Sequence, residues 1–279
     1  METVIEVVGS NGDRVTLAGE NAGMEGIWLA EGVEGLMDPE VDIITKSSGS
    51  RPGSRLVSHR IVERTIVFKV TIENDENDSW ADRDDRWRGL WGYDTPTEIR
   101  VTTTQWGTRI LTAYLNEIEV DTEFDPFVNG STDVTMTVTA YDPFWYAEPK
   151  VMELPKTTSG NYTFKFDEDI NPTPNPVFPE YVLEGKGTYK IPDGDTGVKL
   201  PLTLKQGEAV VVNTDPGTRQ IVEANGVPVW ARMNGVRWRH PLPAKSPVRE
   251  LVVETTGVAV NTPAMLVVRQ PFNRPWGVN

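Results

Sequence analysis

The stretch that most constrains this chain is a run of aromatic residues between two prolines near its middle, Tyr141–Pro149. Each proline fixes its own φ and lacks a backbone donor, and the residue before a proline is pushed out of the helical region. The run is therefore predicted to be extended, to lie outside any paired strand and to act as a stiff joint between two domains. Its four rings should pack against the end of the domain before it or the start of the domain after it. The alternative is an ordinary last strand with an aromatic end.

A chain of 279 residues is long enough for about two domains, each with its own core. We place them at residues 1–149 and 150–279. The chain has no cysteine, so disulfides and thiolate metal sites are excluded. Met1–Val8 has neither a basic leader nor an apolar run of signal-peptide length, and no stretch is apolar for long enough to insert into a membrane. We therefore expect a protein made in the cytoplasm that leaves it only as part of something larger.

The negative charge of the chain is concentrated in its first half. Residues 1–149 carry 12 basic and 28 acidic side chains, a balance of −16, whereas residues 150–279 carry 15 and 13, a balance of +2. An acidic surface repels phosphate backbones, which argues against a protein that reads nucleic-acid sequence. It is compatible with an acidic wall past which DNA slides without sticking.

The first half begins with strand patterns. Apolar residues on both sides of Gly9–Asp13 predict a hairpin, because Asn-Gly supplies the left-handed conformations of a tight turn. Gly26–Val33 is a second strand candidate, and Arg60–Ile72 is the clearest one, with Ile66, Phe68, Val70 and Ile72 alternating onto one face.

Between these strands, Val41–Thr45 leads into a polar segment, Lys46–Arg55, which has almost nothing to bury. We expect it to be a mobile loop or an arm that becomes ordered only against a neighbouring molecule. The arginines Arg51, Arg55 and Arg60 could contact a phosphate, but a solvated basic loop is the interpretation that we favour.

An acidic run, Glu73–Asp78, precedes the one long helix that the sequence predicts, near residues 79–91. The run lacks the glycine and the closing glutamate of a calcium loop, so a solvated turn that caps the helix is the better interpretation. Asp78 or Ser79 can cap the first turn, and Gly92 can end the helix. The helix has one apolar face, which we expect to pack on a sheet, formed by Trp80, Trp87, Leu90 and Trp91.

Three further strands complete the first half, at Glu98–Thr103, Arg109–Val120 and Ser131–Ala140. This predicts a β domain with one helix laid on it.

The second half opens with a proline-rich lead-in at residues 170–179, which we expect to pass in extended form over the surface. Short strands separated by Gly, Pro and Asp turns follow it, and their even spacing predicts an antiparallel sandwich or jelly roll. The predicted strands are Tyr181–Glu184, Thr188–Ile191, Leu200–Leu204, Ala209–Asn213, Gln220–Glu223, Arg249–Glu254 and Ala264–Arg269.

Signs of catalysis are scarce. His59 and His240 fall in different halves, and neither has a metal-ligand partner at helical or hairpin spacing. No phosphate-binding glycine loop and no Gly-x-Ser-x-Gly motif is found. Acidic pairs are plentiful, so sequence alone leaves a glycosidase pair open. We predict no catalytic, cofactor-binding or metal-binding residues, no cofactor and no enzymatic activity.

Taken in order, several segments resemble one protein family. They are the Trp80–Trp91 helix, the Tyr141–Trp145 ending, Asn175–Pro176 followed by Pro179–Gly185, and the Val210–Thr214 strand. This order is similar to that of the distal tail proteins, also called minor tail proteins, of bacteriophages with long non-contractile tails, above all phages of actinobacteria. No single motif carries the resemblance, which spans both halves.

The resemblance implies a mainly β fold, with a tail-tube-like barrel or sandwich carrying one helix, followed by a sandwich similar to galectins or carbohydrate-binding modules. It implies a structural virion protein at the tail tip, whose hexameric ring joins the tail tube to the tip or baseplate hub and leaves a channel for DNA. Its partners would be other copies of itself, the tail tube protein and the hub protein, with the tape measure protein as a further candidate. Assembly would take place in the host cytoplasm.

The rival hypothesis is a carbohydrate-binding protein whose second domain recognises glycans of the host surface. Its candidate residues are Trp230, Trp238 and Trp276, of which Trp238 lies in the group Arg237–His240. Arginine beside tryptophan can stack on and hydrogen-bond a glycan, but the same pair is frequent in protein interfaces.

Overall fold

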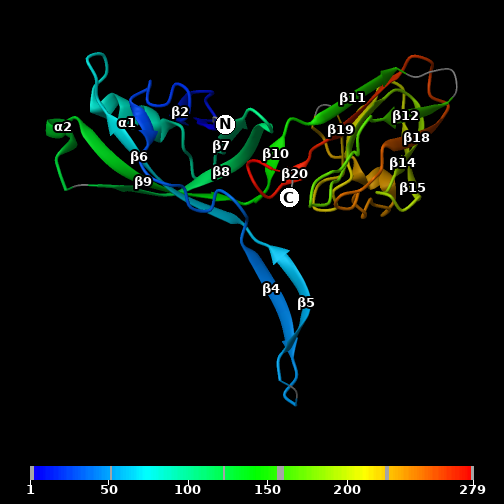
Figure 1. Cartoon of the computed structure of the whole chain (residues 1–279). Helices are drawn as coiled ribbons and strands as arrows, with labels where there is room; N and C mark the ends of the chain where they lie inside the picture. The colour runs from blue at the N-terminus through cyan, green and yellow to red at the C-terminus, as the bar shows by residue number, and fades with distance from the viewer. Residues whose placement is uncertain (1–2, 51, 122, 156–159, 224–225, 278–279) are drawn as a thin grey trace. The chain divides into compact units, whose positions relative to one another are not determined.

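The structure is a computed structural model, and it describes residues 3–50, 52–121, 123–155, 160–223 and 226–277. The chain is mainly β and divides into two compact units (Figure 1). Unit 1 contains residues 1–145 and takes in Asn273–Gly277, whereas unit 2 contains residues 146–272. The sequence analysis assigned all of residues 150–279 to one domain. In the structure, Asn273–Gly277 instead pack in unit 1.

Unit 1 is built on an antiparallel sheet with the strand order β2-β1-β7-β8-β9-β6-β3. Because β2 and β3 also lie beside each other, the sheet is nearly closed into a barrel. The inward residues of β6 and β9 are buried, including Phe68, Val70 and Val138. The strands are β1 (Thr3–Val8), β2 (Arg14–Ala18), β3 (Ile27–Leu29), β6 (Arg64–Glu73), β7 (Thr97–Thr103), β8 (Gly107–Val120) and β9 (Ser131–Ala140).

The predicted hairpin at the start of the chain is confirmed as β1 and β2. Gly12, at φ 86°, takes the left-handed conformation that the turn requires, and Asn11 Oδ1 accepts from the Asp13 amide at 3.0 Å. The predicted strands after the helix are confirmed as β7, β8 and β9. The candidate at Gly26–Val33 is shorter, because regular pairing with β6 covers only Ile27–Leu29.

The strand predicted at Arg60–Ile72 is wrong in its first residues. Arg60 and Ile61 end a different strand, β5 (Ser54–Ile61), which pairs with β4 (Val41–Ser47) in a two-stranded sheet of its own. The Val62 amide donates to the Glu40 carbonyl at 3.1 Å, and β6 begins only at Arg64. β-branched residues occur on both sides of the break, so residue types alone could not show that the chain changes sheets there.

The helix α1 (Trp80–Gly89) begins as predicted, with Ser79 Oγ accepting from the Asp82 amide. Trp87 is fully buried and meets Phe68 of β6 edge-on, with ring centroids 6.3 Å apart. The helix ends earlier than predicted, at Gly89, because the Gly92 carbonyl accepts from the Leu115 amide of β8 at 2.9 Å. The chain after Gly89 thus leaves the helix and runs toward β8.

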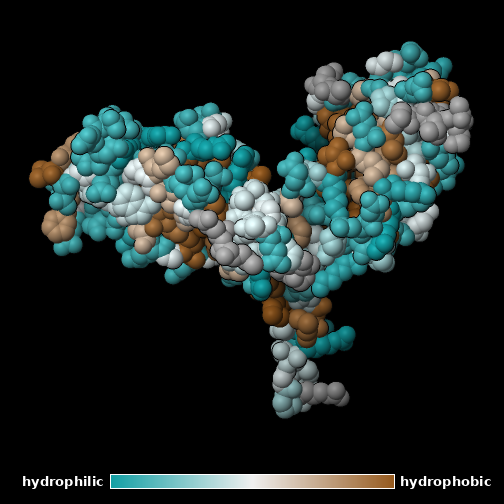
Figure 2. Space-filling view, turned by 45° about the horizontal axis from the view of Figure 1, so that its top comes forward, coloured by the Kyte–Doolittle hydropathy of each residue, from teal (hydrophilic) through white to brown (hydrophobic). Residues whose placement is uncertain are grey.

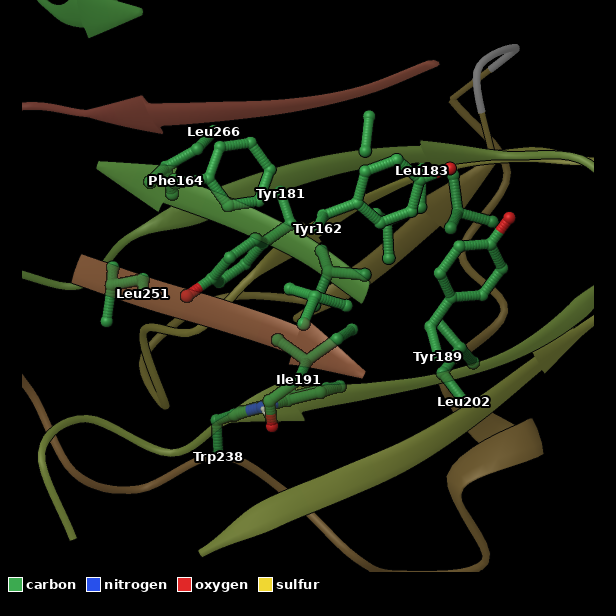
Figure 3. Packing of buried hydrophobic residues seen from close by; sticks show 14 of the residues in the cluster. Tyr162, Phe164, Tyr181, Leu183, Tyr189, Ile191, Leu202, Trp238, Leu251 and Leu266 are labelled. Atoms are coloured by element: carbon green, nitrogen blue, oxygen red, sulfur yellow. Dashed lines mark hydrogen bonds between the residues drawn. The ribbon is translucent and has the colours of Figure 1, made fainter. Parts of the chain in front are cut away.

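Unit 2 consists of two antiparallel sheets around one core. One has the order β11-β19-β13-β16-β17 and the other β12-β18-β14-β15. Figure 3 shows the core between them, where Tyr162, Phe164 and Tyr181 pack closely together. The strands are β11 (Lys150–Pro155), β12 (Asn161–Lys165), β13 (Glu180–Glu184), β14 (Gly187–Pro192), β15 (Lys199–Leu204), β16 (Ala209–Asn213), β17 (Ile221–Glu223), β18 (Glu250–Thr256) and β19 (Pro263–Val268).

All seven strands predicted for the second half are present, but β11 and β12 were missed. Both lie before the proline-rich lead-in, where the sequence analysis placed no strand.

The proline-rich lead-in does not pass over the surface as predicted. Asn171, Thr173 and Asn175 are buried, and the prolines between them are more exposed. Asn171 Nδ2 donates to the carbonyls of Asn175 at 2.9 Å and Pro243 at 2.7 Å, and Asn175 Nδ2 donates to Pro271 at 3.1 Å. The segment is buried because its amide side chains bond to backbone groups of distant segments.

The aromatic run is also partly paired, contrary to the prediction. Trp145–Ala147 form the short strand β10, which pairs with β20 (Pro271–Phe272). Both prolines lie outside β10, so their missing donors do not interrupt it. Of the four rings, Trp145 is fully buried with Nε1 donating to the Leu36 carbonyl at 3.2 Å, whereas Tyr141 is 69% exposed.

Arg64, at the start of β6, is 1% exposed and bonds only to backbone carbonyls. Nε donates to Pro143, Nη1 to Gly35, Leu36 and Met37, and Nη2 to Asn273, at distances from 2.6 to 2.9 Å. Arg109 of β8 donates in the same way to Arg274 at 2.8 Å and Gly277 at 2.6 Å. The two arginines therefore hold the C-terminal segment in unit 1, and burial lowers the pKa of each to about 10.

Arg64→Lys tests this arrangement. The lysine ammonium is compact and has three donors, so it cannot reach all the carbonyls that surround the planar guanidinium of Arg64. Some of these carbonyls would then lose their hydrogen-bond donor. We expect a loss of about 2–4 kcal/mol in the free energy of unfolding, measured by denaturant titration. Arg14→Lys is the matched control, since the side chain of Arg14 is 59% exposed. Equal stability of the two variants would contradict the role of Arg64.

Candidate assembly surface

The most exposed element of unit 1 is the hairpin formed by β4 and β5, here called the arm (Val41–Ile61). It projects away from the sheet, as Figure 1 shows, and every residue of β4 is exposed. Lys46–Arg55 was predicted to be a mobile loop or an arm. Strands cover only the two ends of this range, residues 46–47 and 54–55, and the described residues between them form the turn of the hairpin. The segment is thus the tip of an arm, while its ordering by a neighbour stays a prediction.

The arm carries large apolar side chains that the described residues leave exposed. Ile43 is 65% exposed and Leu56 61%, and Val41, Ile44 and Val57 are exposed as well. Figure 2 shows these hydrophobic residues on the part of the arm nearest the sheet. A two-stranded hairpin alone is marginally stable in water, and exposed apolar patches usually mark a contact with another molecule.

The charge of the arm is positive. Arg60 pairs with Asp42 across the two strands at 2.9 Å, and Lys46 and Arg55 are exposed near the tip. Arg51, which the phosphate hypothesis included, lies outside the described residues. The structure places Arg55 and Arg60 on an apolar hairpin, which favours a protein contact over a phosphate site.

A second exposed apolar group lies next to the N-terminal end of β9, around the short helix α2 (Pro126–Asn129). Asp125 caps the helix by accepting from the Phe127 amide at 3.0 Å, and Gly130, at φ 70°, ends it in the left-handed conformation. The apolar side chains here are Phe124, Phe127 and Val128, and Val128 is 84% exposed. This group, residues 121–129, is called the α2 end below. The sequence analysis did not identify it.

The acidic run before α1 is a structural turn, in agreement with the sequence analysis. Asp75 accepts from the amides of Asn77 at 2.7 Å and Asp78 at 2.9 Å, and it pairs with Arg83 at 2.5 Å. These backbone bonds, with Arg83 added, lower the pKa of Asp75 to about 2. Among the described residues, no group of three or more His, Asp or Glu side chains could hold a metal ion.

Asp75→Asn gives a pH-dependent prediction. The pKa of Asp75 is lower in the folded state than its ordinary value of 3.8, so its contribution to stability is complete above that value and is lost as the pH falls through about 2. The stability difference between wild type and Asp75→Asn should therefore shrink when thermal unfolding is compared at about pH 5 and about pH 2.5. Glu76→Gln is the control, because Glu76 makes no such bond among the described residues. A difference that does not change with pH would contradict the role of the Asp75 carboxylate.

The three tryptophans of the carbohydrate hypothesis do not form one site within unit 2. Trp238 is fully buried in the core of unit 2 (Figure 3), and Trp276 belongs to the C-terminal segment of unit 1, so neither joins a sugar platform in unit 2. Trp230, in the 3-10 helix η1 (Trp230–Met233), is 54% exposed, with the Arg237 guanidinium 5.5 Å from its ring. Trp238 was misassigned because its basic neighbours suggested a surface.

The two histidines are far apart in the chain and serve different roles. His59 is exposed on the arm, whereas His240 Nδ1 pairs with Asp193 Oδ2 at 2.7 Å. Burial raises the pKa of Asp193, but hydrogen bonds from the side chain and amide of His240 and from the Arg239 amide leave it below its ordinary value. This cluster fixes a loop and has the geometry of a structural contact. Within the described residues, no helix is long and apolar enough to span a membrane.

The fold is shared with proteins of phage tail tips. The Dit (gp 19.1) protein of phage SPP1, described as a paradigm of the hub adsorption apparatus in phages that infect Gram-positive bacteria, superposes with a TM-score of 0.62 at 15% identity. The match covers 96% of this chain and 99% of that one. A chain of the phage P2 baseplate in its activated conformation with calcium gives a TM-score of 0.58 at 11% identity, covering 97% and 98%. The fold is thus the Dit-like fold of tail hub proteins.

Sequence similarity gives the family. The chain is 32% identical to the minor tail protein Gp27 of Mycobacterium phage D29 and equally to Gp27 of Mycobacterium phage L5, over 99% of this chain and 99% of each relative. It therefore belongs to the family of phage minor tail proteins that includes Gp27. No protein-family model matches the chain.

Proposed function

We propose that this protein forms a ring, hexameric by resemblance to distal tail proteins, that joins the tail tube to the tip or baseplate hub. Its partners are then further copies of itself, the tail tube protein and the hub protein, with the tape measure protein as a candidate inside the ring. Unit 1 forms the ring, and unit 2 forms an outer sandwich of the galectin or carbohydrate-module type. The ring is assembled in the host cytoplasm and ends at the tail tip.

The observation that carries this proposal is the exposed apolar arm. A cyclic assembly needs a surface on each copy that contacts a different surface on the next, and the arm reaches beyond its own sheet with uncovered apolar residues. The solved structures with this fold come from hub and baseplate proteins, which supports a place in an assembly. The proposal requires no reaction, so it assigns no catalytic residue.

The acidic excess of the first half supports the DNA channel. Carboxylates on the inner wall of a ring would repel the phosphate backbone and let DNA pass without binding. Acidic residues that all face outward in the assembled ring would remove this support.

The proposal is tested on the purified full-length chain by analytical ultracentrifugation and negative-stain images over a range of concentrations. We expect rings for the wild type, and a shift to monomers for the double variant Ile43→Asp with Leu56→Asp, because two charges on the arm prevent its burial in an interface. Val198→Asp is the control, since Val198 is 52% exposed in unit 2. A wild-type chain that stays monomeric at all concentrations, or rings that persist in the arm variant, would contradict the proposal.

A further inference from the structure

Unit 1 carries two uncovered apolar surfaces of opposite charge. One is the arm, with Ile43, Leu56 and Val57, and the other is the α2 end, with Phe124, Phe127 and Val128. Both are exposed by more than half at their main residues, and they come from segments about seventy residues apart. Figure 2 shows hydrophobic side chains at both places.

The charges around these surfaces are complementary. The arm, residues 41–61, has four basic side chains and one acidic side chain, Asp42, which pairs with Arg60. Residues 117–133, which surround α2, have six acidic side chains and no basic one. Of these carboxylates, Glu117, Glu119, Asp121, Glu123 and Asp125 are exposed.

The signs of the charges decide which surfaces can meet. Contact between two arms would bring basic groups together, and contact between two α2 ends would bring acidic groups together, so both like pairs are disfavoured. Contact between an arm and an α2 end buries apolar side chains in the centre and pairs opposite charges around them, which is the usual arrangement of an interface.

We propose that the arm of one copy docks on the α2 end of the next copy of this chain. Leu56 and Val57 pack against Phe127 and Val128, and Arg55 and Lys46 face the carboxylates of Glu123 and Asp121. The contact is heterologous, so each copy offers one arm and receives another, and repetition closes a ring. The inference rests on the proposed ring and names the two surfaces that form it.

The absence of cysteine from the chain allows a direct test by cross-linking. In the full-length double variant Leu56→Cys with Val128→Cys, oxidation of assembled protein should give a ladder of covalent multimers on a non-reducing gel. A mixture of the two single variants should give covalent dimers only, because each contact then holds one pair of thiols and cannot extend further. Leu56→Cys mixed with Val198→Cys, which places the second thiol in unit 2, should give none.

Charge reversal supplies a second measurement. Arg55→Glu should raise the protein concentration at which half of the chains are assembled by at least about tenfold, and adding Glu123→Lys should recover part of that change. Arg219→Glu, which reverses an exposed basic residue of unit 2, is the control and should have little effect.

The outcomes separate this inference from the proposed function. Rings without a ladder in the double variant, or a covalent dimer of Leu56→Cys alone, would overturn the pairing of arm with α2 end and leave the ring itself standing. A chain that never assembles would overturn both. A ladder together with recovery by Glu123→Lys would establish the contact.

Discussion

The buried guanidinium of Arg64 is the interaction on which the arrangement of unit 1 depends. It donates to the carbonyls of five residues, from the loop at Gly35–Met37, from Pro143 and from Asn273. A buried charge is costly unless its donors are satisfied, and the Asp38 carboxylate acts on Arg64 through its charge alone. The guanidinium therefore ties the backbone of three distant segments to the start of β6.

The two kinds of surface in unit 1 have different physical consequences. The barrel-like sheet buries the inward residues of its central strands β6 and β9 within the chain itself. The arm and the α2 end leave large apolar side chains in water, which costs free energy in a single chain and is recovered only when another molecule covers them.

Much of the fold was predictable from local patterns. Alternating residues predicted β7, β8 and β9, and helical spacing with a serine cap predicted the start of α1. Prediction failed where distant segments decide the outcome. The prolines at residues 170–179 suggested a surface passage, but the carbonyls of Pro243 and Pro271 accept from Asn171 and Asn175 and make burial of the segment favourable. The prediction for Trp238 failed for the same reason, since its basic neighbours gave no indication that its side chain is buried in the core.

By itself the sequence determined the mainly β class, the family resemblance and the charge imbalance between the halves, because these follow from residue types and their local spacing. Only the tertiary structure decided that Arg64 and Arg109 hold the C-terminal segment in unit 1, that Arg60–Ile61 leave the main sheet for the arm, and that Phe127 and Val128 stay largely exposed. Each of these depends on contacts between residues far apart in the chain. Local propensity carries no information about such contacts, since their free energy appears only when the segments meet.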